Sequence, residues 1–160
     1  MGSGKTTVGK KLARLLGAAH LDMDALVEQH SGRSISDWFA QEGEWAFRLA
    51  ERDALHRTAQ EERVVVSTGG GAPCFFDNMD WINAHGTSVY LHLEAAALVA
   101  RLRQSKEPRP LLASIRTEWW EPWIAGKLEE REPFYRQAAH TVSGHSVDVA
   151  ALAEKLRPLL

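Results

Sequence analysis

The sequence of 160 residues contains a single cysteine, Cys74, which excludes an internal disulfide. It also lacks an excess of charge of either sign, because 19 lysines and arginines stand against 21 aspartates and glutamates. This balance gives no reason to expect a nucleic-acid or membrane partner. No apolar run approaches the roughly 18 residues of a membrane span, and no secretory leader opens the chain. We therefore expect a cytoplasmic protein in which Cys74 is a small packed side chain.

The composition is that of an ordinary globular domain, with 44% hydrophobic and 25% charged residues. Helical patterns alternate with short apolar segments, which favours an α/β fold with a parallel β-sheet covered by helices on both faces. Strands are expected at 19–22, 64–66, 88–93 and near Thr141, and helices from the opening glycines to Leu16 and at 25–30, 35–42, 45–62, 77–84, 94–104, 122–131 and after Asp148. We predict one domain over residues 1–160, with a turn at Pro133.

Residues 105–120 break this alternation with prolines, charges and tryptophans. The stretch is longer than the usual loop of a compact α/β domain, which favours a mobile lid. Beside it, Trp119, Trp120 and Trp123 fit the packing face of an amphipathic helix.

The opening residues have the chemistry of a phosphate-binding loop. Glycines let backbone N–H groups converge on phosphate oxygens, Lys5 can reach the β- and γ-phosphates, and the Thr6 hydroxyl can bind magnesium. The candidate nucleotide-binding residues are Gly2, Ser3, Gly4, Lys5, Thr6 and Thr7. The full pattern needs a further glycine and a strand before Met1, so a flexible glycine-rich N-terminus is the alternative reading.

Two carboxylates follow the strand at 19–22. Asp22 and Asp24 are two residues apart, and in an extended segment they point the same way, so that one serves a metal and the other a substrate hydroxyl. In the alternative reading, Asp24 merely caps the next helix.

Two arginines are candidates for binding an acidic substrate. Arg48 shares a helix face with Glu44 and Glu51, which is equally the pattern of a surface ion-pair ladder. Arg131 stands at a predicted helix end before Pro133, a position that suits a carboxylate clamp or a simple C-terminal charge.

Glycines and a third arginine complete the candidate site. Gly69, Gly70 and Gly71 follow a strand, and three consecutive glycines allow the backbone to approach a ligand closely. Arg109 lies within 105–120, where an arginine can neutralise a transferring phosphoryl group or simply face solvent.

Taken together, these motifs resemble the shikimate kinase family. The resemblance is carried by GSGKTT, DMD, GEWAFR, STGGGA, RPLL and REPFY, in this order and with comparable gaps, from Met1 to about Val142. It implies a P-loop kinase fold with a five-stranded sheet, a substrate-binding region at about 24–57 and a lid at about 105–120. It also implies transfer of the ATP γ-phosphoryl group to the 3-hydroxyl of shikimate, with Mg²⁺ as cofactor, and we expect a monomer.

The resemblance also assigns roles to single residues. It implies that Lys5 and Arg109 bind the phosphates, with Lys5 as charge clamp, and that Thr6 binds magnesium directly and Asp22 through water. It implies that Asp24 contacts the reacting hydroxyl and that Arg48 and Arg131 bind the substrate carboxylate. The substrate also contacts the backbone of Gly69, Gly70 and Gly71. Lys5, Asp24 and Arg109 are thus the expected catalytic residues. For the adenine, His145 is the candidate.

The sequence departs from the family at its start, where the first strand and the first glycine of the phosphate loop are absent. That strand lies in the middle of the family's sheet, so we expect a sheet without its central partner and a natural protein that starts upstream. Two alternatives stay open. One is a related small-molecule P-loop kinase, such as a gluconate kinase, which should lack the paired arginines; the other is a non-catalytic P-loop-derived binding protein.

Overall fold

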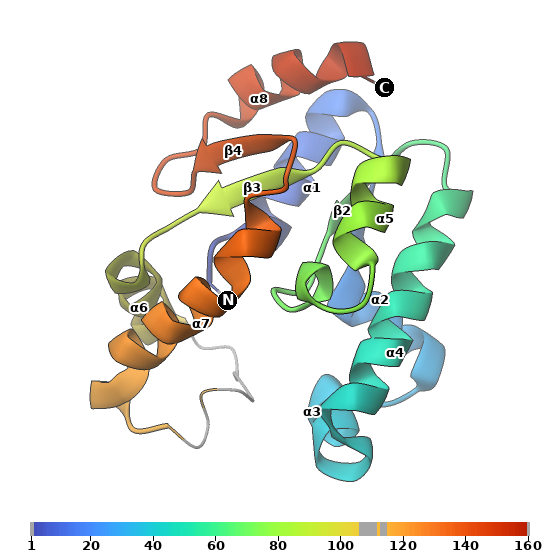
Figure 1. Ribbon diagram of the computed structural model, residues 1–160. Helices are drawn as coiled ribbons and strands as arrows, with labels where there is room; N and C mark the ends of the chain where they lie inside the picture. The colour runs from blue at the N-terminus through green and yellow to red at the C-terminus, as the bar shows by residue number, and fades with distance from the viewer. Residues whose placement is uncertain (1, 106–111, 113–114, 160) are drawn as a thin grey trace.

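The computed structural model describes residues 2–105, 112 and 115–159 (Figure 1). Its strands are β1 (Ala19–Asp22), β2 (Val64–Ser67), β3 (Val89–His92) and β4 (His140–Ser143). Its helices are α1 (Lys5–Leu16), α2 (Met23–Ser31), α3 (Ile35–Asp37), α4 (Gly43–Arg57), α5 (Asn78–His85), α6 (Ala95–Gln104), α7 (Trp120–Tyr135) and α8 (Val149–Leu156), with a π-helical turn at Trp38–Glu42. This order confirms the predicted alternation of strands and helices.

The four strands form two parallel pairs. β1 pairs with β2 from Ala19 opposite Val64 onward, and β3 pairs with β4 from Val89 opposite His140 onward. In the described residues no ladder joins β2 to β3, so the five-stranded sheet implied by the family resemblance is not formed. Instead, β2 and β3 line a cavity of about 610 Å³. The expectation of a sheet without its central partner is thereby confirmed.

One hydrophobic core holds the two strand pairs together. It is formed by α1 and α8, which lie next to each other in Figure 1, and residues of β2, β3 and β4 pack against it. Its members are Leu12, Leu16, Leu152, Ala153 and Leu156, with Val65, Val89 and Val142 against them. Because α1 and α8 contact strands from both pairs, they keep β2 and β3 in place without backbone hydrogen bonds between them.

Two further cores build the rest of the molecule. One joins α2, α4 and α5 to β2 around Met23, Phe47 and Leu55, and the other joins α6 to α7 around Leu102 and Ile124. These helices, with α1 and α8, cover the strands as an α/β fold requires. None of the helices in the described residues has the length and apolar character needed to cross a membrane.

Two expectations about the last third of the chain are wrong. Helix α7 runs through Pro133 to Tyr135, so no turn separates Arg131 from the residues after the proline. Trp119 is 60% exposed and does not pack, whereas Trp120 and Trp123 lie against the core of α6 and α7 as predicted.

Candidate active site

The phosphate-loop residues form a tight turn directly before α1. Gly2 and Gly4 have φ values of 66° and 90°, in the left-handed region that favours glycine. Helix α1 begins at Lys5, and no side chain caps its first backbone N–H groups. A helix N-terminus of this kind attracts anions, because unpaired N–H groups and the helix dipole act together.

The two residues predicted to hold a metal lie in direct contact. The Thr6 hydroxyl donates to Asp22 Oδ2 over 2.7 Å, which joins the first turn of α1 to the end of β1. A hydroxyl and a carboxylate are hard oxygen ligands, the type that Mg²⁺ prefers, so the pair fits a magnesium ion that also binds phosphates and water.

Asp24 is placed differently from the prediction. Helix α2 begins at Met23, so Asp24 lies in its first turn and not on an extended segment beside Asp22. Asp22 is the residue that caps α2, since its Oδ1 accepts from the Asp24 N–H over 3.1 Å. Burial raises the pKa of Asp24, and the negative charge of Asp22 raises it further. Asp24 is therefore a carboxylate with an enhanced affinity for a proton, although part of its surface is exposed to solvent.

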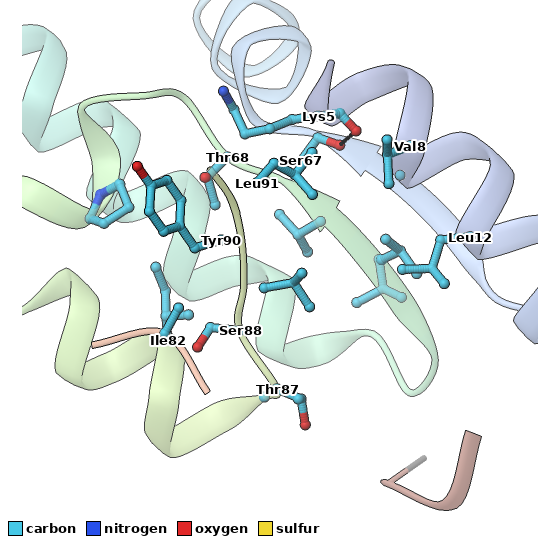
Figure 2. A pocket seen from close by; sticks show the side chains of 18 of the residues that line it. Lys5, Val8, Leu12, Ser67, Thr68, Ile82, Thr87, Ser88, Tyr90 and Leu91 are labelled. Atoms are coloured by element: carbon cyan, nitrogen blue, oxygen red, sulfur yellow. Dashed lines mark hydrogen bonds between the residues drawn. The ribbon is translucent and has the colours of Figure 1, made fainter. Parts of the chain in front are cut away.

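Ser67, at the carboxyl end of β2, anchors the phosphate loop and was missed in the sequence. Its hydroxyl donates to the backbone carbonyl of Lys5 over 3.1 Å (Figure 2), and His20 Nε2 lies 3.0 Å from the same oxygen. A Cβ on Gly9 would lie 2.5 Å from the Ser67 oxygen, which explains why α1 carries a glycine there. The sequence signal was a polar residue that ends an apolar strand.

Arg101 ties the phosphate loop to the segment after β4. Its guanidinium donates to the carbonyl of Ser3 over 3.0 Å and to the carbonyls of Gly144 and His145 over 2.6 and 3.4 Å. The loop that carries His145 thus lies beside the phosphate loop. The contact of His145 with adenine stays a prediction.

Arg48 and Glu51 form a buried ion pair, which rules out the surface ladder. Arg48 is 3% exposed and Glu51 1% exposed, and the Arg48 Nη1 atom donates to Glu51 Oε2 over 2.7 Å. The Nη2 atom of Arg48 donates to Glu44 Oε1 over 2.9 Å, and the guanidinium lies over the ring of Phe75. Burial alone lowers the pKa of Arg48, but the charge of Glu51 and its hydrogen bonds raise it above the ordinary value. Arg48 therefore carries its positive charge at any physiological pH.

Glu51 is a site residue that the sequence reasoning did not select. Its second carboxylate oxygen, Oε1, is buried and has no hydrogen-bond partner among the described residues. Burial raises the pKa of this carboxyl, while Arg48 and Arg131 lower it. The sequence signal was present in the shared face of Glu44, Arg48 and Glu51, but spacing alone does not distinguish a buried pair from an exposed one.

The three glycines bring the backbone against these charged groups. A Cβ on Gly69 would collide with Glu51 Oε1 and would lie 3.3 Å from Asp24 Oδ1. A Cβ on Gly71 would collide with the guanidinium of Arg48. The loop therefore approaches its protein neighbours more closely than a residue with a side chain allows, and the approach of its backbone to a ligand stays a prediction.

Arg131, on α7, contributes a positive charge to the group formed by Glu51, Cys74 and the glycine loop. Its charge, together with that of Arg48, acts on the Cys74 thiol, whose pKa burial raises to about 11. It also acts on Glu51 and on Tyr135, whose hydroxyl donates to the Gly70 carbonyl. The structure thus brings Arg48, Arg131 and the glycine loop together, although Arg131 lies inside α7 and not at a helix end. Cys74 is half-buried, in agreement with the prediction of a packed side chain.

Lys5 and Arg109 are the two side chains predicted to bind the phosphates. The Lys5 ammonium group donates to the Ser3 hydroxyl over 3.4 Å, so the side chain lies alongside its own loop. Arg109 lies outside the described residues, as do 106–111 and 113–114 of the predicted lid, and its contact with phosphates stays a prediction.

The arrangement combines two kinds of binding site. One end offers backbone N–H groups, an ammonium group and a pair of hard oxygen ligands, which suits a nucleotide with its magnesium ion. The other end offers two guanidinium groups beside a carboxylate of raised pKa, which suits a small hydroxylated acid.

Comparisons with known proteins agree with this chemistry. The model of the shikimate kinase family matches residues 1–158. The chain is 44% identical to the shikimate kinase of Parabacteroides distasonis, with 100% of this chain and 95% of that protein covered. It is similar to the crystal structure of shikimate kinase from Bacteroides thetaiotaomicron, with a TM-score of 0.90 at 38% identity, covering 99% of this chain and 93% of that one. A shikimate kinase from Acinetobacter baumannii in complex with shikimate matches with a TM-score of 0.86 at 36% identity, covering 99% of this chain and 87% of that one. A buried arginine against a glycine loop, with a second arginine on α7 and a phosphate loop beside them, is thus found in a chain that belongs to the shikimate kinase family of ATP-dependent kinases.

Proposed function

We propose that this chain transfers the γ-phosphoryl group of ATP to the 3-hydroxyl of shikimate, with the residues described above in the roles that follow. The observation that carries the proposal is the convergence of Arg48, Arg131 and Asp24 at the glycine loop, next to the contact between Thr6 and Asp22. All of these residues belong to one catalytic domain.

In the proposed complex, the phosphate loop from Gly2 to Thr7 holds the nucleotide. Its backbone N–H groups and the N-terminus of α1 face the phosphate oxygens, and Lys5 adds a positive charge. In this proposal Thr6 would hold the magnesium ion as a ligand, and Asp22 would hold it through a water molecule. When bound, magnesium neutralises charge on the phosphates and fixes their orientation.

At the other end, Arg48 and Arg131 bind the shikimate carboxylate. Two guanidinium groups present parallel N–H donors that match the planar carboxylate, whereas a neutral sugar alcohol leaves these cations unpaired. Glu51 holds Arg48 in place through its buried hydrogen bond. The backbone at Gly69, Gly70 and Gly71 adds further contacts to the substrate.

Asp24 accepts the proton during transfer. The substrate oxygen forms its bond to the γ-phosphorus, the bond between that phosphorus and the β,γ-bridging oxygen breaks, and ADP leaves. The hydroxyl proton passes to the Asp24 carboxylate, whose raised pKa improves it as a proton acceptor. Most of the rate enhancement then comes from positioning and charge neutralisation, as in other phosphoryl transfers.

The experiment is an ADP-release assay with shikimate and gluconate measured side by side. We expect release that depends on shikimate and not on gluconate, because gluconate lacks the rigid ring that spaces its carboxylate from the reacting hydroxyl. Release with gluconate alone would identify the related kinase, and ATP binding without release for either compound would identify a binding protein. Both results contradict the proposal.

We also propose that the chain works as a monomer in the cytoplasm. The whole candidate site comes from one chain, so catalysis needs no second copy, and ATP is available in that compartment. Light scattering at the assay concentration should give the mass of one chain. A dimer that loses activity in step with its dissociation would contradict the monomer.

A further inference from the structure

Helix α7 brings a tyrosine into the candidate site together with Arg131. The helix continues through Pro133, so Tyr135 lies one turn after Arg131 on the same helix face. The Tyr135 O–H donates to the carbonyl of Gly70, and the positive charge of Arg131 acts on the same phenol. One side chain therefore holds the predicted substrate-binding backbone and is influenced by a predicted carboxylate-binding arginine on the same helix face.

The Gly70 carbonyl differs from its two neighbours in how it is held. The carbonyl of Gly69 accepts from the backbone N–H of Ala72 over 3.3 Å, and that of Gly71 accepts from the backbone N–H of Cys74 over 2.8 Å. The contacts described for the Gly70 carbonyl come from side chains: the Tyr135 hydroxyl over 2.5 Å and the Cys74 thiol over 4.0 Å. The thiol is a weak donor, so Tyr135 is the main restraint on this carbonyl.

This restraint matters because the segment consists of glycines. Glycine explores φ and ψ more widely than any other residue, so a run of three has a large conformational entropy to lose on ordering. Holding the Gly70 carbonyl fixes the peptide plane between Gly70 and Gly71, and with it the direction of the Gly71 N–H group.

We propose that Tyr135 is a positioning residue for shikimate, which fixes the Gly70–Gly71 peptide and the Arg131 guanidinium relative to each other. The inference rests on the proposed function of this site and adds a residue to which no role had been assigned. Tyr135 does not react: it donates to the Gly70 carbonyl, lies one helical turn from Arg131 and thereby sets the geometry into which the substrate carboxylate fits.

The protonation state of Tyr135 agrees with this role. Burial raises the pKa of the phenol, and the charge of Arg131 opposes the shift without reversing it. The hydroxyl therefore keeps its proton, and remains a donor to the Gly70 carbonyl, throughout the pH range in which ATP-dependent kinases work.

The chain offers a matched control in Tyr90. Its ring packs against the ring of Tyr135 with centroids 5.0 Å apart, and its hydroxyl also donates to a half-buried acceptor, Glu132 Oε2, over 2.9 Å. Glu132 lies next to Arg131 in sequence but pairs with Arg136, away from the glycine loop. Replacing either tyrosine by phenylalanine removes one hydroxyl and keeps the ring packing.

The test compares Tyr135→Phe and Tyr90→Phe in steady-state kinetics and thermal unfolding. In Tyr135→Phe we expect the KM for shikimate to rise about tenfold, the change that one lost hydrogen bond produces, while the KM for ATP stays within about twofold. In Tyr90→Phe we expect both KM values to stay within about twofold. Both variants lose one hydroxyl from the same pair of rings, so we expect a similar fall in Tm in both. A rise in the KM for shikimate that occurs only in Tyr135→Phe then reports positioning and not packing.

Two results would overturn the inference. One is an unchanged KM for shikimate in Tyr135→Phe; the other is an equal rise of the KM for ATP and for shikimate, which marks general loosening of the fold. Both are read against an unsubstituted chain that phosphorylates shikimate. If the unsubstituted chain releases no ADP with shikimate, the proposed function itself fails, and the role of Tyr135 fails with it.

Discussion

Two opposing influences act on the charge of the Asp24 carboxylate. The N-terminus of α2 favours a carboxylate in its first turn, whereas burial and the adjacent Asp22 disfavour the charge. The net result is a raised pKa of Asp24. An acid whose pKa is higher in the folded chain than in the unfolded chain stabilises the fold only while it is protonated.

Replacing Asp24 by asparagine should separate activity from stability. We expect kcat to fall at least about 100-fold, because the variant has no proton acceptor at the hydroxyl. The stabilising contribution of Asp24 is complete below its unfolded pKa of about 3.9 and is lost as the pH rises through its folded pKa. Asp24→Asn should therefore have a higher Tm than the parent at neutral pH, and this advantage should vanish near pH 4. Thermal unfolding across this range measures it.

The control for this prediction is Asp148→Asn. Asp148 caps α8 by accepting from the Ala151 N–H over 2.9 Å, and asparagine caps helices about equally well. This variant should keep both the activity and the Tm profile of the parent. A parental kcat in Asp24→Asn would remove Asp24 from the reaction.

Arg131 is the better of the two arginines for testing the carboxylate clamp. Loss of Arg48 would leave Glu51 buried without its partner, at a cost of about 3 to 5 kcal/mol in folding, which obscures any effect on binding. Arg131→Ala should raise the KM for shikimate roughly 30-fold or more, which corresponds to a loss of about 2 kcal/mol in the free energy of binding. The KM for ATP should stay unchanged. Lysine should restore little, because it lacks the two parallel donors of arginine.

Arg136 provides the comparison on the same helix. It is exposed and pairs with Glu132 at the surface, so Arg136→Ala should leave both KM values within about twofold. If Arg131→Ala and Arg136→Ala behaved alike, Arg131 would be one more surface charge and the clamp would be wrong.

At the scale of single elements, the features that sequence reasoning found are those with local causes. The strand at 19–22 is β1 in the structure, and the helix expected after Asp148 is α8, whose first turn the Asp148 carboxylate caps by accepting from the Ala151 N–H. Each of these depends on residues within one turn of one another. Local chemistry was sufficient to predict them.

The errors arose where tertiary contacts outweigh local preference. Pro133 removes one backbone hydrogen bond from α7 and would end an isolated helix, but packing of α7 against α6 and the contacts of Tyr135 keep the helix intact. Likewise, the spacing of Arg48 and Glu51 is the same whether a helix face is wet or buried, so only the fold shows that the pair is buried. The motifs located most of the candidate site, and the packing decided which of its residues touch.

The glycine loop offers a test at the element scale. In Gly71→Ala the added methyl group collides with the Arg48 guanidinium, which is held by Glu51 and cannot move freely. We expect a loss of about 1 to 3 kcal/mol in stability and a rise of about tenfold or more in the KM for shikimate. Urea unfolding and the kinetic assay measure these two effects.

The matched substitution is Gly126→Ala inside α7. A Cβ at Gly126 meets no described atom within 4 Å, so alanine should stabilise the helix by about 0.5 to 1 kcal/mol and leave the kinetics unchanged. Should Gly71→Ala be as harmless as Gly126→Ala, the close approach of the loop to Arg48 would have no consequence for binding.

At the scale of the whole molecule, the dominant feature is the cavity between β2 and β3. Figure 2 shows Val8 and Leu12 of α1 on one side and Leu91 of β3 on the other, with Lys5 and Ser67 at the end where the phosphate loop lies. The backbone groups on the facing edges of β2 and β3 have no strand partner in the described residues. Unpaired edges of this kind weaken a sheet and leave the loops at its carboxyl ends less firmly held.

The edges of the cavity suit a piece of β-strand. β2 and β3 are each four residues long, they line the same cavity, and no ladder joins them in the described residues. A strand between them would pair with both facing edges. The walls of the cavity are apolar on the side of α1, so valine and isoleucine are the residues that fit.

An added strand should therefore stabilise the molecule and improve nucleotide binding together. We predict that extending the chain before Met1 by about ten residues, an apolar strand followed by glycine, raises Tm by on the order of 10 °C. Each new backbone hydrogen bond contributes about 0.5 to 1.5 kcal/mol, and several form at once. ATP affinity and shikimate phosphorylation should rise with Tm, because the strand would lead directly into Gly2 and complete the phosphate loop.

A glycine–serine extension of equal length is the control, since it adds chain without strand propensity or apolar side chains. Equal Tm, ATP affinity and activity for the strand extension, the glycine–serine extension and the 160-residue chain would show that the core of α1 and α8 alone holds the phosphate loop in its working geometry.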